Sequence, residues 1–351
     1  MFLMIFLLSS GLFLGWSLGA NDAANIFGTA VSTKMIRFRT AAIIGSIFVI
    51  IGAVVSGGGA TETLGKLGTI NSLSGAFTVA LAAALTVLWM TKLKLPVSTS
   101  QAIVGAIISW NFYARLPTDY SSLLKIVSTW VFCPVLSASI AMLLYFAAKY
   151  LINKFPVSII LMDSYTRTGL IIVGAFGAFS LGANNIANVM GVFVPISPIP
   201  AGSILGINLS GSQMLFLLGG IAISVGIITY SKGVIETVGT DLFRLSPIAA
   251  FIAVLSKAIV LFIFASEALK LWLTARGLPS FPLVPVSSSQ AVVGAVLGIG
   301  IAKGGHNIKF GVLGKIGLGW VTTPVAACII CYILLFIMQN LFMFEVVSSA
   351  G

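Results

Sequence analysis

Charged residues are scarce in this chain of 351 residues, because Asp, Glu, Lys and Arg together make up only 8% of it. A typical soluble domain carries about 25%. Hydrophobic residues reach 58%, and the mean hydropathy is +1.12. Apolar runs of roughly 20 residues, the length of a bilayer span, recur from end to end. The scarcity of charge therefore excludes a soluble domain and predicts an all-α polytopic membrane protein.

Cysteine and histidine are also rare. Three cysteines in apolar runs exclude a disulfide framework. Cys328 and Cys331 have the spacing of a metal or redox pair, but no other Cys or His is near them in the sequence, so we interpret both as packing residues. The single histidine, His306, lies in an expected loop. No nucleophile and base pair, catalytic metal cluster or P-loop is visible, so an enzyme or an ATP-driven pump is not expected.

The net charge of +11 comes from Lys and Arg in short clusters between the apolar runs. This is typical of membrane loops that face an anionic leaflet, and it does not favour nucleic acid as a partner. The partner that this charge pattern predicts is the lipid bilayer. The apolar units are expected at 1–31, 41–57, 73–91, 96–112, 127–152, 168–200, 211–230, 247–269, 285–302 and 313–344.

Two segments of the chain are near copies of each other. The stretch 18–28, Leu-Gly-Ala-Asn-Asp-Ala-Ala-Asn-Ile-Phe-Gly, matches 181–191 at seven of eleven positions, and Asn185 stands where the first copy has Asp22. The segment 96–105 matches 285–294 at eight of ten positions. The chain is therefore interpreted as a duplication. The expected repeats are 1–155 and 156–351, and a register slip of fifteen residues places an insertion near 266–284.

Each copy contains five apolar units, which is an odd number of membrane crossings. The second copy must then begin on the opposite side of the membrane, which predicts two inverted-topology repeats. If the N-terminus is outside, thirteen Lys and Arg residues fall inside and five outside. The positive-inside rule therefore favours both termini outside the cell.

The repeated Asn-rich motif introduces oxygen-bearing side chains into apolar sequence. We expect it to interrupt its helix in both copies, because a helix broken in the membrane exposes backbone groups only where they line a cavity or bind a ligand. Carboxylate and amide oxygens suit a small alkali cation better than a transition metal. The alternative is simple helix capping. The predicted cation ligands are Asn21, Asp22, Asn184 and Asn185.

The two Pro-Val-Ser segments form a second pair of candidate sites. Proline starts a helix well, and the hydroxyl groups that follow would cluster where free backbone N–H groups and the positive end of the helix dipole point at a ligand. This arrangement is typical of an anion site. Ordinary Ser/Thr capping is the alternative. The predicted anion-binding residues are Ser98, Thr99, Ser100, Gln101, Ser287, Ser288, Ser289 and Gln290, together with Asn25 and Asn188 of the Asn-rich motif.

Three further ionisable residues stand in or near apolar sequence. Lys257 lies in an apolar run where the first copy has Ala83, and we leave open whether it snorkels, pairs with Glu267 or attracts an anion. Glu62 and Glu236 occupy equivalent positions in the two copies. Both are interpreted as helix-end or gating residues.

At these motifs the chain resembles the inorganic phosphate transporter (PiT) family, whose mark is Gly-Ala-Asn-Asp-x-Ala-Asn in each half. The resemblance implies inverted repeats, broken helices, helical hairpins that bring the count to about 10–12 transmembrane helices, and phosphate uptake with sodium or protons. Two departures stand out: Asn185 replaces the usual aspartate, and Val49 and Val254 stand where some relatives have glutamate.

The resulting expectation is a secondary active transporter that imports inorganic phosphate with sodium ions by alternating access. Phosphate would bind between the two Pro-Val-Ser segments and sodium, the coupling ion, at the Asn-rich motifs; no other cofactor is expected. A proton-coupled phosphate or sulfate symporter is the alternative within the class, and an anion channel is the alternative outside it. The expected location is the inner (plasma) membrane. A homodimer is an expectation that no residue pattern supports directly.

Overall fold

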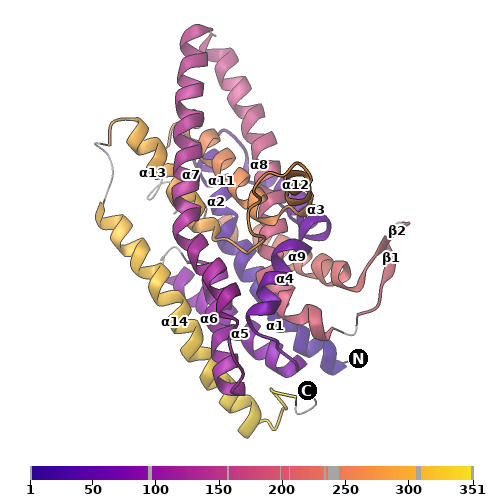
Figure 1. Cartoon of the computed structure of the whole chain (residues 1–351). Coiled ribbons are helices and arrows are strands. Elements are labelled where there is room, and N and C mark those ends of the chain that lie inside the picture. Colours follow the sequence, from indigo (N-terminus) through magenta and orange to yellow (C-terminus); the bar gives the residue numbers. More distant parts are fainter. Residues whose placement is uncertain are drawn as a thin grey trace.

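The computed structural model describes residues 2–93, 97–155, 158–197, 199–204, 206–232, 235, 245–305 and 310–348, which form a bundle of helices (Figure 1). The helices of the first repeat are α1 (Phe2–Asp22), α2 (Ala24–Ser32), α3 (Phe38–Ser56), α4 (Gly58–Leu67), α5 (Leu73–Lys92), α6 (Thr99–Ala114) and α7 (Tyr120–Lys154). The second repeat contains α8 (Ile159–Met190), η1 (Gly191–Ile196), β1 (Gly202–Ile204), β2 (Ile207–Leu209), α9 (Gly211–Thr229), α11 (Pro247–Ala265), α12 (Glu267–Thr274), α13 (Ser288–Ala302) and α14 (Phe310–Asn340).

Eight of the described helical segments are long and apolar enough to cross a bilayer, which confirms a polytopic all-α membrane protein. They are α1 with the start of α2, then α3, α5, α7, α8, α9, α11 and α14. The predicted fourth and ninth units correspond to α6 and α13, which have only 16 and 15 residues. At 1.5 Å per residue these helices span roughly 22–24 Å, less than the roughly 30 Å of a bilayer core. Each follows an extended Val-Ser segment that ends at its N-cap.

The Asn-rich motif behaves differently in its two copies. In the first copy α1 ends at Asp22, Ala23 forms a turn, and α2 begins at Ala24. In the second copy α8 continues without a break through the motif to Met190, so the expected interruption is not found there. Amide side chains can lie on a continuous helix without breaking its backbone hydrogen bonds. The non-helical segments in the interior are those directly before α6 and α13.

Close helix contacts occur in equivalent pairs that join the two repeats. A Cβ atom on Gly19 of α1 would meet the Ile223 carbonyl of α9, and one on Gly182 of α8 would meet the Val49 carbonyl of α3. Gly19 corresponds to Gly182 in the aligned copies, and Val49 to Ile223. The first membrane-spanning helix of each repeat therefore packs against the second membrane-spanning helix of the other, as α1 does on α9 and α8 on α3. The closeness of these crossings requires glycine.

The two short helices, α6 and α13, also make equivalent close contacts with the other repeat. A Cβ atom on Gly105 of α6 would meet the backbone of Pro324 in α14, and one on the equivalent Gly294 of α13 would meet Pro134 in α7. The two repeats are thus interlocked and do not form separate bodies. Reciprocal contacts of this kind are what a two-fold relation between the halves would produce.

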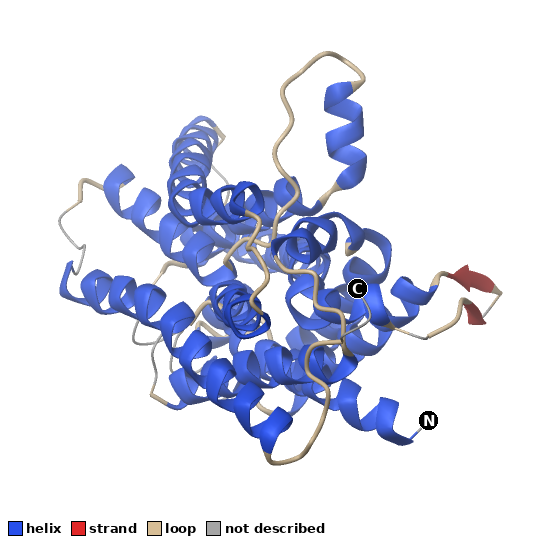
Figure 2. Cartoon of the chain, turned by 60° about the horizontal axis from the view of Figure 1, so that its bottom comes forward, coloured by secondary structure: helices blue, strands red, loops and turns tan. Residues whose placement is uncertain are grey.

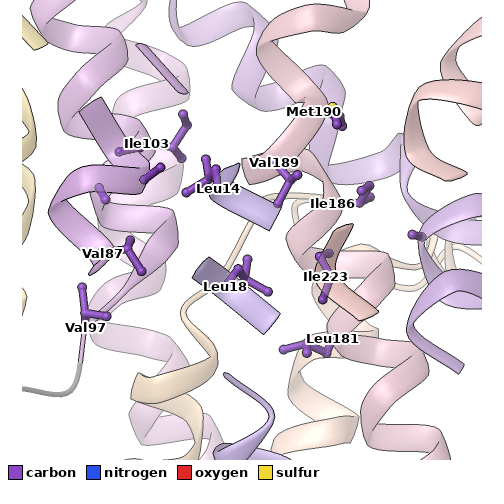
Figure 3. Packing of buried hydrophobic residues seen from close by; sticks show 14 of the residues in the cluster. Leu14, Leu18, Val87, Val97, Ile103, Leu181, Ile186, Val189, Met190 and Ile223 are labelled. Atoms are coloured by element: carbon purple, nitrogen blue, oxygen red, sulfur yellow. The ribbon is translucent and has the colours of Figure 1, made fainter. Parts of the chain in front are cut away.

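Apolar side chains pack in the interior and also cover the outside. Figure 3 shows the interior, where Leu14 and Leu18 of α1 lie among residues of α6, α8 and α9. On the outer surface of α7, four apolar side chains are at least 64% exposed, as expected for a surface solvated by lipid. These residues are Leu124, Val131, Phe132 and Leu143.

Two features depart from a plain helical bundle. Strands β1 and β2 form an antiparallel hairpin that stands out from the helices (Figure 2). The predicted insertion at 266–284 contains α12 and an extended return segment, in which Val284 N donates to Phe264 O at 3.2 Å. Both chain ends lie at the lower end of the molecule in Figure 1, where the Ser72 hydroxyl and the Trp110 indole donate to the Val346 carbonyl.

Candidate functional site

The two Pro-Val-Ser segments cross in the centre of the molecule. The Ser100 hydroxyl donates to the Val286 carbonyl at 3.2 Å, and the Ser289 hydroxyl donates to the Val97 carbonyl at 2.9 Å. Ser100 and Ser289 are equivalent in the two copies, as are Val97 and Val286. The two hydrogen bonds are therefore the same contact made in both directions, and they hold the N-termini of α6 and α13 beside each other.

The first serine of each segment caps its helix. Ser98 accepts from the Gln101 backbone N–H, and Ser287 accepts from the Gln290 backbone N–H, both at 3.3 Å. The Ser287 hydroxyl also lies 3.0 Å from that of Ser289. Ordinary capping thus accounts for Ser98 and Ser287, as the sequence alternative anticipated, but it does not account for the residues that follow them.

Five buried oxygen atoms at this crossing have no hydrogen-bond partner within the described part of the chain. They are Thr99 Oγ1, Gln101 Oε1, Asn188 Oδ1, Ser288 Oγ and Gln290 Oε1. All five residues are at most 3% exposed. Leaving a buried polar group unpaired costs about 1–3 kcal/mol, so such groups are rare unless a ligand or water satisfies them. Four of the five again form equivalent pairs, Thr99 with Ser288 and Gln101 with Gln290.

The first copy of the Asn-rich motif places a buried carboxylate beside this crossing. Asp22 is 3% exposed, and its Oδ1 accepts from Asn21 Nδ2 at 3.1 Å and from Asn25 Nδ2 at 3.3 Å. The Ser288 hydroxyl at the start of α13 lies near this carboxylate without forming a hydrogen bond to it. Asn21 and Asn25 are only partly buried, so their amide groups border accessible space.

The second copy of the Asn-rich motif forms hydrogen bonds with other segments of the protein. Asn184 donates to the Val284 carbonyl at 3.3 Å, and its Oδ1 accepts from the Val286 backbone N–H at 3.1 Å. Asn184 thereby anchors the extended segment before α13 to α8. Asn188 donates to the Ser100 hydroxyl at 2.9 Å and to Asn185 Oδ1 at 3.0 Å. The second motif is consequently part of the framework that joins the two Pro-Val-Ser segments.

Lys257 is the charged residue at this site whose role the sequence left open. It is 0% exposed, and its Nζ has no hydrogen-bond or ion-pair partner among the described residues. The ammonium group lies near enough to Asp22 to interact with its charge, and it lies near Cys133, whose thiol contacts the Ser287 carbonyl at 3.8 Å. Full burial rules out snorkelling. Glu267 is exposed beyond the end of α11, so the pair considered from the sequence is not formed.

The other ionisable candidates lie away from the crossing. Glu62 is exposed on α4 and pairs with Lys66, whose hydrogen bond and charge hold the pKa of the Glu62 carboxyl below its ordinary value. This geometry fits a helix-surface pair and gives no support for gating. Glu236 and His306 lie outside the described residues.

Comparison with known proteins gives consistent matches over almost the whole chain. A family model described as "Phosphate transporter family" matches residues 18–331 and 271–349. A protein of Methanocaldococcus jannaschii that carries the name of a phosphate permease is 32% identical over 318 residues, which cover 90% of this chain and 92% of the relative. A sulfate permease of Bacillus subtilis is 29% identical over 334 residues, covering 92% of this chain and 84% of the relative.

One solved structure, named as the sodium-dependent phosphate transporter, has the same fold. Its TM-score with this chain is 0.76 at 24% sequence identity. The match covers 97% of this chain and 99% of that chain. The overall fold is therefore shared along nearly the full length.

Proposed function

Because the chain belongs to the phosphate transporter family, we propose that it imports inorganic phosphate coupled to sodium ions. Members of this family are transporters and not enzymes. The observation that carries the proposal is the set of unpaired oxygen atoms where α6 and α13 begin, beside the buried carboxylate of Asp22. A site of this kind can hold an oxyanion and a cation together.

Phosphate would bind between the N-termini of α6 and α13. The positive ends of two helix dipoles meet there, and free backbone N–H groups of the first helical turns can donate to phosphate oxygens. The hydroxyl groups of Thr99 and Ser288 add one donor from each repeat. Gln101 and Gln290 present carbonyl oxygens, which can accept from the O–H of a protonated phosphate or bind a cation.

Sodium would bind at the first Asn-rich motif. Asp22 supplies the negative charge, and Asn21 supplies an amide oxygen from partly accessible space. Hard oxygen ligands of this type suit an alkali cation. Asn184 and Asn185 are the ligands that the sequence predicts in the second repeat, but their oxygens accept from the Val286 N–H and from Asn188, which a cation would have to displace.

Charge balance explains why cations should accompany the substrate. Phosphate carries roughly −1.5 to −2 at neutral pH. Each negative charge moved into a negative-inside cell costs about 2.3 kcal/mol per 100 mV. A sodium ion near Asp22 would also screen that carboxylate from the anion, so occupancy of one site would raise the affinity of the other.

Alternating access would follow from an inverted arrangement of the two repeats. The reciprocal contacts of Gly19 with Ile223 and of Gly182 with Val49 support a two-fold relation. An odd number of crossings per repeat would make that relation an inversion across the membrane. The excess of Lys and Arg in the loops between spans favours termini outside and insertion in the plasma membrane.

Sulfate is a second candidate substrate. The Bacillus subtilis relative named as a sulfate permease aligns with 92% of this chain. A site that holds a tetrahedral oxyanion with hydroxyl and backbone donors does not by itself distinguish the two anions. Competition of unlabelled sulfate with labelled phosphate uptake separates them, because a phosphate carrier keeps its uptake rate in a tenfold excess of sulfate.

The proposal is tested by uptake of radiolabelled phosphate into proteoliposomes. An inward sodium gradient is expected to drive accumulation, and an equal potassium gradient is expected not to. Uptake that follows an inward proton gradient and ignores sodium would replace sodium coupling by proton coupling. Rapid equilibration without accumulation under any gradient would indicate a channel.

A further inference from the structure

The two repeats differ in charge at two equivalent buried positions. The first repeat has Asp22 and Ala83, whereas the second has Asn185 and Lys257. All four residues are at most 3% exposed. The central fixed charge is therefore −1 from the first repeat and +1 from the second. Both differences change the second repeat in the same direction, toward positive charge.

Lys257 carries a buried ammonium group that no described residue pairs with. Its Nζ lies more than 4.0 Å from every carboxylate oxygen of the described residues, and no described group accepts a hydrogen bond from it. Its nearest charged neighbour is Asp22, and it also lies near Cys133, whose thiol contacts the residue that caps α13. A buried ammonium without a partner is strongly unfavourable, so a negatively charged ligand is expected to complete its surroundings.

The second repeat also lacks free ligands for a cation. Asn185 Oδ1 accepts from Asn188, and Asn184 Oδ1 accepts from the Val286 backbone. Neither side chain carries a charge, so neither can offset the charge of a cation as a carboxylate does. The same position in the first repeat, at Asp22, offers a carboxylate.

We propose that Lys257 is a substrate-binding residue that takes the place of a coupling cation in the second repeat. Its ammonium group binds the phosphate oxyanion directly beside the N-terminus of α13. Sodium then binds only at the Asp22 side, and the Lys257 charge stays with the protein when phosphate leaves. This inference rests on the proposed function, and it predicts a lower number of sodium ions per phosphate than a carrier with an acidic residue in both repeats.

Binding measurements on the purified protein test the first part. Lys257→Met keeps most of the side-chain volume and removes the charge, and Lys270→Met makes the same change at an exposed position on α12. We expect phosphate to bind about ten- to a hundredfold more weakly to Lys257→Met, as for the loss of a charge-assisted hydrogen bond, and normally to Lys270→Met. Isothermal titration calorimetry reports the affinity.

Stability distinguishes a binding role from a structural one. Removing an unpartnered buried charge is expected to leave the midpoint of thermal unfolding without phosphate unchanged or higher, while the stabilisation by phosphate is lost. If Lys257 serves only to neutralise Asp22, the double variant Lys257→Met with Asp22→Asn should regain phosphate affinity. Such recovery, or wild-type affinity in Lys257→Met, would overturn the proposal.

A charge exchange tests the second part. Lys257→Ala combined with Asn185→Asp gives the second repeat the residues of the first. The Hill coefficient of uptake for sodium is expected to rise from about one to about two, with two sites as its upper limit. A wild-type value near two, or no change in the double variant, contradicts the inference. If wild-type uptake ignores sodium, sodium coupling fails, yet calorimetry in sodium-free buffer still decides whether Lys257 binds phosphate.

Discussion

The two copies of the Asn-rich motif share seven of eleven residues but have different structural roles. In the first copy Asp22 ends α1, and its bonds to Asn21 and Asn25 stay within the motif. In the second copy the helix continues, and Asn184 and Asn188 bond to the extended segment before α13 and to Ser100 of α6. The comparison teaches that a duplicated motif can supply a ligand site in one repeat and a framework in the other.

The two copies of the motif differ in charge at one position, where the first copy has Asp22 and the second has Asn185. Replacing Asp22 by Asn would keep the shape of the side chain but remove the negative charge that a cation needs. In the second copy Asn185 uses its amide to donate to the Leu181 carbonyl at 3.3 Å. Within the Asn-rich motif the difference in charge therefore comes from one carboxylate, and the variants that follow remove this difference or test how far it extends.

Asp22→Asn should have the largest effect, because it gives the first copy the residue of the second. We expect sodium-driven phosphate uptake to fall by a factor of about a hundred or more, as for loss of an intramembrane ion ligand. Radiolabelled uptake in proteoliposomes measures it. Asp163→Asn, which removes an exposed carboxylate paired with Arg167 on α8, is the control and should transport normally. Normal uptake in Asp22→Asn would show that the carboxylate is not a cation ligand.

Asn184→Ala and Asn21→Ala should distinguish a structural role in the second copy from a sodium-binding role in the first. The first leaves the Val284 carbonyl and the Val286 N–H unpaired, and we expect a loss of roughly 2–4 kcal/mol of stability. The second removes a partly exposed amide, so stability should change little while the sodium concentration for half-maximal uptake rises. Thermal unfolding in detergent and sodium titration of uptake report the two effects. Equal destabilisation of both variants would remove the distinction between the copies.

Gly19→Ala and Gly182→Ala test the reciprocity of the helix crossings. In each variant the new methyl group would meet a carbonyl of the other repeat, so both should lose about 1–3 kcal/mol of stability. Gly28→Ala is the matched control, because no atom outside its own helix turn lies within 4 Å of an added Cβ. A large loss in one crossing variant and none in the other would argue against a two-fold relation.

Ser100→Ala and Ser289→Ala should have the smallest effects. Each removes one hydrogen bond between the Pro-Val-Ser segments, worth about 0.5–1.5 kcal/mol. Each serine has one further contact, since Ser100 accepts from the Asn188 amide and the Ser289 hydroxyl lies 3.0 Å from that of Ser287. The Ser287 hydroxyl can rotate to another partner whereas the Asn188 N–H cannot, so the loss from Ser100→Ala should be the greater of the two. The midpoint of thermal unfolding gives the order. A greater loss from Ser289→Ala would show that the contact between Asn188 and Ser100 contributes little.

Much of the architecture could be predicted from the sequence. Long apolar runs must become helices in a bilayer, since an unpaired backbone is excluded there, so all ten predicted units coincide with helices. Transport and membership of the family were anticipated from the two motifs and are confirmed by the matches over the chain. Two of the ten units, α6 and α13, are shorter than a span, because each helix starts only after a Val-Ser pair that is not helical.

Other features depend on packing that one sequence does not reveal. The continuity of α8 could not be predicted, because Asn is compatible both with a helix interior and with a break. The burial of Lys257 depends on how α11 turns its faces toward α7, α8 and α13. The roles of the sodium and phosphate residues remain predictions, since they concern ions whose binding only experiment can show.

The most direct test of a pocket shared by both repeats is a cryo-electron microscopy structure with sodium and phosphate. The account predicts phosphate density within hydrogen-bond distance of Thr99 and Ser288, where α6 and α13 begin, and cation density at Asp22. Phosphate density away from both helix N-termini, or a cation bound only by residues outside the two Asn-rich motifs, would contradict it.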